Sequence, residues 1–166
     1  MTIAASGVVS GVVTFRLNSG RDARRMRREK LERLFLAHTA FVGQLGVSWF
    51  PYMKVMDGSI SYNDALDMTI KREADRERHL ETIEMLVALY FPELSRGLEE
   101  LTAIRDVAAA TISAHKEAYK RVGPHPTKAL EKLKNSSIEL DEHTVRFRSE
   151  MAKLAQALGA RSKYAA

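Results

Sequence analysis

Apolar residues recur at alternating steps of four and three positions over most of this chain, and this spacing limits the folds it can adopt. Steps of four and three place side chains on one stripe of an α-helix, whereas a half-buried strand needs strict alternation. Turn residues interrupt the pattern at 57–59, at Pro92 and in the GPHP sequence at 123–126. The pattern predicts four long helices, over about residues 21–50, 62–91, 92–122 and 127–158.

Four helices of about 30 residues with short connections are expected to pack as antiparallel neighbours. We therefore predict an all-α fold, an up-down-up-down bundle of four long helices over residues 21–166, preceded by an apolar, helical segment over residues 1–20. Pro51 is expected to kink or restart the first helix, and Ser61 with Asp64 resembles a capping box for the second. In the first helix the predicted inward stripe consists of Leu31, Phe35, His38, Val42, Leu45 and Trp49.

The N-terminal segment has no charged side chain from Met1 to Phe15. If it is helical, Gly7 and Gly11 lie one turn apart, and small residues at this spacing let two helices approach closely in lipid. Counting on to Gly20 gives about 20 residues, or about 30 Å, just enough to span a bilayer. We predict a membrane anchor with a self-association face; the alternatives are a short strand, a mobile tail or packing on a partner chain. The predicted face consists of Ala4, Gly7, Gly11 and Thr14.

A basic segment follows at once, which we call the collar. Between residues 16 and 33 it has eight Arg or Lys and three acidic residues, and this net charge of +5 equals that of the whole chain. Such a segment beside an apolar one favours anionic membrane lipid, with the bundle on the cytoplasmic side of the inner or plasma membrane. Nucleic acid is a less favoured partner because no aromatic residues interleave with the basic ones, and an ordinary solvated helix face is the other alternative. The collar consists of Arg16, Arg21, Arg24, Arg25, Arg27, Arg28, Lys30 and Arg33.

Charged residues also fall on the predicted stripes in the middle of the bundle. Register counting from the turns brings them to about one level, where they form either a buried ion-pair layer or a small site for an anionic ligand. The alternatives are that the layer only fixes helix register, or that these side chains face water. The layer consists of His38, Glu73, Arg76, Arg105 and Thr144.

The sequence RLFLAH, from Arg33 to His38, resembles the R-x4-H signature of HEPN ribonucleases, which are helical bundles that cut RNA. The resemblance covers six residues and implies that His38 is a general acid or base and that Arg33 holds a phosphate. In the alternative interpretation, which we prefer, His38 belongs to the apolar stripe and Arg33 ends the collar.

Other motifs with a known chemistry are missing from the sequence. The chain has no Cys, no Glu-x-x-His pair of di-iron bundles, no HExxH motif and no phosphate-binding loop, so we predict no metal site and no cofactor. If residues 1–20 are not an anchor, the protein is expected in the cytoplasm. Our predicted function is a non-enzymatic, membrane-anchored interaction or scaffold protein that forms homo-oligomers and binds an unknown cytoplasmic protein. By analogy with toxins and antiviral effectors, such an oligomer could organise or perturb the membrane.

Overall fold

The computed structural model describes residues 4–69, 73–123 and 128–160, with side chains for 22–69, 77–123 and 128–159. Five α-helices and one short 3-10 helix make up nearly all of this part, and it contains no strand. The all-α prediction is therefore confirmed. The elements are α1 (Ala4–Met56), α2 (Tyr62–Thr69), α3 (Glu73–Tyr90), η2 (Pro92–Leu94), α4 (Ser95–Val122) and α5 (Ala129–Ala160).

Helix α1 contains both the apolar N-terminal segment and the first bundle helix, which we predicted as separate elements because their compositions differ. It runs without interruption from Ala4 to Met56, 53 residues or about 80 Å, and so contains the apolar segment, the collar and the first predicted bundle helix. Pro51 neither ends nor restarts it. A proline removes one backbone hydrogen bond, and here it lies in the last two turns, where few such bonds follow.

The second predicted helix is divided in two. Helix α2 ends at Thr69, and α3 begins at Glu73, within the charged stretch from Lys71 to His79. Charged side chains at stripe positions gain nothing from burial, so this part of the sequence does not favour one continuous packed helix. The capping box is present, since Ser61 N donates to Asp64 Oδ2 at 2.9 Å and Asp64 N donates to Ser61 Oγ at 3.3 Å.

The last two helices, α4 and α5, lie close to the ranges predicted from the sequence. Helix α4 ends at Val122, and Gly123 after it has a φ of +80°, with its N–H donating to Tyr119 O at 2.8 Å. This left-handed conformation suits glycine because it has no Cβ. Helix α5 continues to Ala160, and the predicted cap Thr127 lies outside the described residues.

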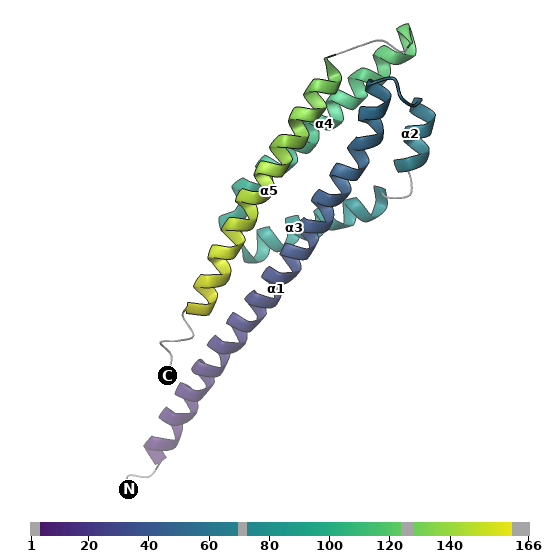
Figure 1. Cartoon of the computed structure of the whole chain (residues 1–166). Helices are drawn as coiled ribbons and strands as arrows, with labels where there is room; N and C mark the ends of the chain where they lie inside the picture. Colours follow the sequence, from purple (N-terminus) through teal and green to yellow (C-terminus); the bar gives the residue numbers. More distant parts are fainter. Residues whose placement is uncertain (1–3, 70–72, 124–127, 161–166) are drawn as a thin grey trace.

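One core lies between α1, α3, α4 and α5, and all four helices contribute buried side chains to it (Figure 1). Leu45, Trp49 and Leu31 are buried as predicted. Phe35, however, is 42% exposed, while Leu34 is fully buried, so the inward face of α1 is turned by about one residue from the predicted stripe in this region. The largest fully buried side chains include Leu34, Phe41, Leu45, Ile83, Leu86, Phe91, Leu101, Leu133 and Phe147.

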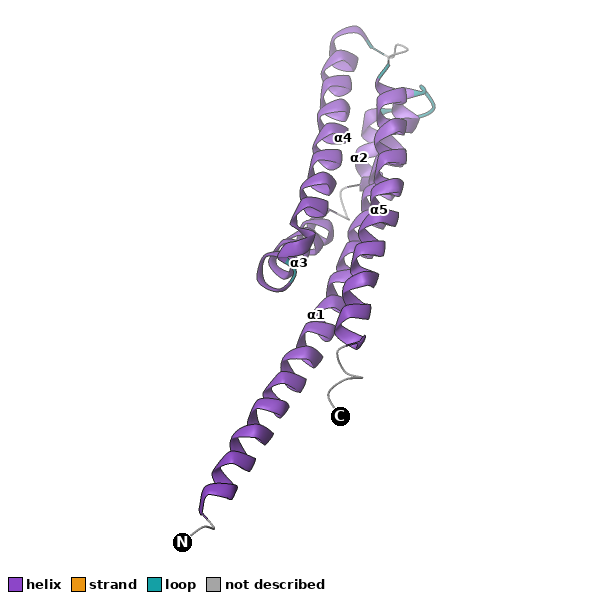
Figure 2. Ribbon diagram, turned by 90° about the vertical axis from the view of Figure 1, so that its left-hand side faces the viewer, coloured by secondary structure: helices purple, strands orange, loops and turns teal. Residues whose placement is uncertain are grey.

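Helix α1 extends far beyond the rest of the bundle. We call the end where η2 joins α3 to α4, and where α5 ends, the base. Figures 1 and 2 both show the first part of α1 continuing past the base with no other helix beside it. The opposite end carries the α1–α2 turn and the start of α5. The molecule is therefore a helical bundle with one protruding helical arm.

Candidate functional site

The collar lies at the base, where α1 leaves the bundle. Arg27 Nη2 donates to the carbonyl oxygen of Tyr90 at 2.9 Å and to Glu93 Oε1 at 3.1 Å. Its guanidinium group also lies 5.4 Å from the centre of the Phe91 ring. A guanidinium group that bonds a backbone carbonyl and a carboxylate and also lies over a ring has a well-fixed orientation. Arg27 therefore joins α1 to the α3–η2 corner.

Two further collar residues contact the bundle at the same level. Lys30 Nζ lies 5.6 Å from the centre of the Tyr90 ring. A Cβ added at Gly159 would lie 3.6 Å from Arg28 Nη2, so the Arg28 guanidinium group lies at the last turn of α5. A cation there is favourable because the C-terminal end of a helix carries a partial negative charge.

Exposed arginines complete the described part of the collar. Arg25 and Arg33 face outward, and Arg28 is also exposed although it reaches the last turn of α5. Arg25 Nε donates to Glu29 Oε1 at 3.1 Å on the helix surface. The guanidinium groups of these three arginines therefore remain accessible beside the point where the arm begins. The side chains of Arg16 and Arg21, and those of the predicted face at Ala4, Gly7, Gly11 and Thr14, lie outside the described side chains, although the α1 backbone is helical through all of them.

The structure does not bring Arg33 and His38 together. His38 is 0% exposed, whereas Arg33 is exposed, and five positions on a helix are about 140° apart. The His38 ring stacks on the Phe147 ring at 4.7 Å between centroids. This geometry places His38 in the core and leaves it no open cleft shared with Arg33.

A second buried histidine, His143, lies beside His38, and we did not predict it. The ring centroids are 6.1 Å apart, and His143 Nε2 donates to the carbonyl oxygen of Gly97 at 2.7 Å. Three ring nitrogens of this pair have no hydrogen-bond partner among the described residues: Nδ1 and Nε2 of His38, and Nδ1 of His143. His143 flanks the predicted stripe residue Thr144, so a wider stripe would have included it.

Burial controls the charge of this pair. Desolvation, with smaller contributions from His143 and Arg148, lowers the pKa of His38 from 6.5 to about 4. Desolvation also lowers the pKa of His143, partly opposed by its bond to Gly97. Both rings are thus neutral at pH 7, and His38 packs as part of the core.

The predicted polar layer is not brought together as one ion-pair layer in the described residues. Arg105 forms an ion pair with the adjacent Asp106 at 2.7 Å, and Thr144 Oγ1 donates to the carbonyl oxygen of Leu140 at 2.7 Å. The side chains of Glu73 and Arg76 lie outside the described side chains. Of the predicted set, His38 and Thr144 are buried and Arg105 lines a groove between α1 and α4.

That groove measures about 470 Å³ and lies beside an aromatic cluster. In the cluster, Tyr62 Oη lies 2.6 Å from His115 Nδ1, and the Tyr62 ring meets Tyr119 edge to face at 5.0 Å. Desolvation by burial, with smaller electrostatic contributions from Tyr52 and Tyr119, raises the pKa of Tyr62 to about 12. A neutral phenol bonded to a histidine ties α2 to α4 and does not supply a reactive phenolate.

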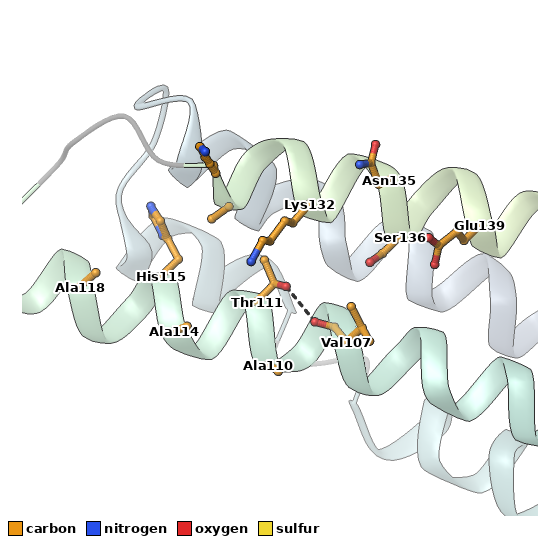
Figure 3. Close-up of a pocket in the computed structure, with 12 residues that line it drawn as sticks. Val107, Ala110, Thr111, Ala114, His115, Ala118, Lys132, Asn135, Ser136 and Glu139 are labelled. Carbon is orange, nitrogen blue, oxygen red and sulfur yellow. Dashed lines mark hydrogen bonds between the residues drawn. The ribbon is translucent and has the colours of Figure 1, made fainter.

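A second groove, of about 690 Å³, lies between α4 and α5 (Figure 3). Small side chains at Ala110, Ala114 and Ala118 form its α4 wall, and Lys132 points into it from α5. The dashed bond joins Thr111 Oγ1 to the Val107 carbonyl oxygen at 2.8 Å, which is local to α4. No group of three acidic or histidine side chains in the described part of the chain is placed to hold a metal ion.

Comparison of the chain with models of known protein families, with curated proteins and with solved structures finds no match. Within the described residues, no helix combines the length and apolar character needed to cross a bilayer. The predicted membrane span is therefore not supported. The base of the bundle, with its exposed arginines and protruding arm, is the candidate functional site.

Proposed function

We propose that this chain is a non-enzymatic interaction protein that attaches to anionic membrane surfaces by its N-terminal arm and collar. Residues 1–20 act as the attachment segment and residues 21–166 as the interaction domain. In this domain α2 and α3 together form the second leg of an up-down-up-down bundle, which presents its surface to protein partners.

The observation that carries the proposal is the arm itself. Helix α1 continues past the base with no described helix beside it (Figures 1 and 2), and its sequence is uncharged as far as Phe15. Val, Gly, Ser and Thr dominate that stretch, and these are weak helix formers. A lone helix of this composition is unstable in water, so its helical state calls for a lipid surface or another chain.

The collar favours a lipid surface over another chain as the partner of the arm. Basic residues next to an apolar segment gain about 1 kcal/mol each near an anionic bilayer. Arg25, Arg28 and Arg33 are exposed beside the start of the arm, so lipid headgroups can reach them when the arm lies in the interface. This attachment needs no bilayer span, because an interfacial helix buries one side only. By the positive-inside rule, the expected location is the cytoplasmic face of the inner or plasma membrane.

Vesicle cosedimentation tests the proposal. We expect full-length protein to bind vesicles that contain anionic phosphatidylglycerol, and to bind neutral phosphatidylcholine vesicles far more weakly. The triple variant Arg25→Gln/Arg28→Gln/Arg33→Gln should lose up to about 100-fold in affinity for the anionic vesicles, because it removes three basic residues.

The matched control removes three cations at the opposite end of the bundle. Arg121, Lys128 and Lys134 are also exposed, and their replacement by Gln changes the net charge by the same amount. This control variant should bind within about 3-fold of the wild type, since its cations lie more than a Debye length from the bilayer. Equal losses in both variants, or equal binding of both vesicle types, would contradict the proposal.

A further inference from the structure

The middle of α1 has a second apolar surface that faces away from its own core. From Leu34 to Met53 the helix carries no charged side chain. Its inner side is buried, yet Leu36 is 67% exposed, Val47 50% and Phe50 59%. Ala40 and Gly43 lie between them at the same steps of four and three. We call these five residues, Leu36, Ala40, Gly43, Val47 and Phe50, the outer stripe of α1.

Gly43 lies at the centre of this stripe. A Cβ added there would meet nothing within 4 Å, so none of the described residues requires a glycine at this position. Glycine costs a helix interior about 1 kcal/mol relative to alanine. A residue that weakens the helix and lies at the centre of an exposed apolar stripe fits a site where another backbone comes close.

We propose that a second copy of this chain covers the outer stripe, with the two α1 helices antiparallel and a two-fold axis at Gly43. A two-fold contact is self-complementary: if one residue meets another, the second meets the first. With the axis at Gly43, Leu36 lies opposite Phe50 of the partner subunit, seven residues to either side. Both residues are large, apolar and exposed, and the two-fold axis repeats their contact, so the interface contains it twice.

The ends of the stripe select this orientation. Glu32 lies eleven residues before Gly43 and Lys54 eleven residues after it, so in the antiparallel pair each Glu32 faces a lysine of opposite charge. A parallel pair would place Glu32 against Glu32 and Lys54 against Lys54. Farther out, Glu29 would approach Asp57. Arg25 pairs with Glu29 within each chain at 3.1 Å, and Lys54, 3.8 Å from Asp57 of its own chain, lies between that carboxylate and Glu32 of the partner subunit. The contact runs about 33 Å along the helix.

This inference goes beyond the membrane proposal and does not depend on it, because the outer stripe lies within the bundle and not on the arm. It is tested on the full-length chain without lipid, by sedimentation equilibrium. Because a single helix stripe is smaller than a standard interface of about 800 Å² per partner, we expect a dimer with a dissociation constant in the micromolar range. A protein that remains monomeric up to about 0.5 mM would overturn the proposal.

Gly43→Glu is the decisive substitution. It places two carboxylates at the two-fold axis and should weaken the dimer at least about 100-fold. Since the site is open in the monomer and Glu is a good helix former, the unfolding midpoint, measured at a protein concentration where the wild type is monomeric, should stay equal or rise. The matched control is Leu89→Glu on α3, where Leu89 is 67% exposed and off the stripe. A dimer that Gly43→Glu leaves intact, or that Leu89→Glu disrupts equally, would overturn the proposal.

Orientation is measured by cross-linking, because the chain has no native cysteine. Under mild oxidation, Leu36→Cys protein mixed with Phe50→Cys protein should form a disulfide-linked heterodimer far faster than either variant alone. Faster cross-linking of Leu36→Cys with itself would show a parallel pair and overturn the two-fold axis at Gly43. If the cysteines at positions 36 and 50 become protected from a thiol reagent only after anionic vesicles are added, the stripe binds lipid, and this result would overturn the proposal as well.

Discussion

The two sides of α1 between Leu34 and Met53 come from one uncharged stretch, but they have different surroundings. The inner side, with Leu34, Phe41 and Leu45, is at most 1% exposed and packs against α3 and α5. The outer side, with Leu36 and Phe50, is more than half exposed. The same helix therefore carries one apolar surface that is buried in the bundle and a second that the bundle leaves exposed. Burial, not composition, separates the two.

The largest expected difference between the two sides is in stability. Leu34→Ala or Leu45→Ala should lower the free energy of unfolding by about 2–5 kcal/mol, because each removes a fully buried side chain. Leu36→Ala should change it by less than about 0.5 kcal/mol in the monomer. Urea unfolding followed by circular dichroism at low protein concentration measures both. Similar losses from Leu36→Ala and Leu34→Ala would show that the outer side is buried after all.

The next largest effect is the pH dependence of the free energy of unfolding, and on α1 it comes from the inner side, where His38 lies. The pKa of His38 is about 4 in the folded chain and 6.5 in the unfolded one, so the unfolded state takes up a proton first as the pH falls. The contribution of His38 is complete above about pH 6.5 and falls as the pH decreases to about 4. The expected loss is about 3 kcal/mol.

His38→Leu separates this histidine from other titrating groups. The substitution keeps an apolar side chain of similar size beside Phe147 and removes two buried nitrogens that lack hydrogen bonds in the described residues. The pH dependence of unfolding between 6.5 and 4 should become flatter by most of the expected loss. An unchanged slope in His38→Leu would mean that other groups, such as His143, cause the dependence.

Two glycine substitutions give a smaller and opposite pair of effects. In Gly97→Ala the new Cβ would lie 2.5 Å from Phe147 Cδ2, so the rings beside His38 must shift, and we expect a net loss of about 1–2 kcal/mol. In Gly43→Ala no atom of the described residues lies within 4 Å of the new Cβ, and helix propensity predicts a gain of about 1 kcal/mol. Thermal unfolding of the two variants compares them directly. A gain in both would show that α4 and α5 are not in close contact at Gly97.

The smallest expected change in stability is on the arm. Val9→Asp/Val13→Asp places two charges in the uncharged stretch beyond the base, and it should leave the unfolding midpoint of the bundle within about 2 °C. Binding to anionic vesicles should fall more than about 10-fold, since buried carboxylates are costly in the membrane interface. Unchanged binding would remove the arm from the attachment site.

The sequence was sufficient to predict the helices and much of the core, because a four-three spacing with clear turn residues has few alternatives. The caps at Ser61 and Gly123 follow from the same local rules. The division of the second helix was missed because its stripe continues through charged positions. The burial of Leu34 in place of Phe35 was missed because both are apolar, and only the packing of α3 and α5 decides which one turns inward.

The candidate site was predicted only in part. The collar is visible as a charge cluster in the sequence. Its division into residues that contact the bundle, Arg27, Arg28 and Lys30, and the outward-facing Arg25 and Arg33 depends on where α1 meets the base. His143 was missed because it lies one position before the predicted stripe residue Thr144. The outer stripe was missed because its residues lie next to those of the predicted stripe of α1, on the side that faces away from the core. A one-sided pattern does not show that a helix has two apolar faces.

The most direct test of membrane attachment is the depth of the arm in the bilayer. Because the chain has no cysteine, Ser10→Cys and, separately, Arg121→Cys each provide one site for a fluorescent label. With anionic vesicles that contain nitroxide-labelled lipids, we predict strong quenching at position 10 and almost none at position 121, at the opposite end of the bundle. Quenching at position 10 that is no greater than at position 121 would contradict the account.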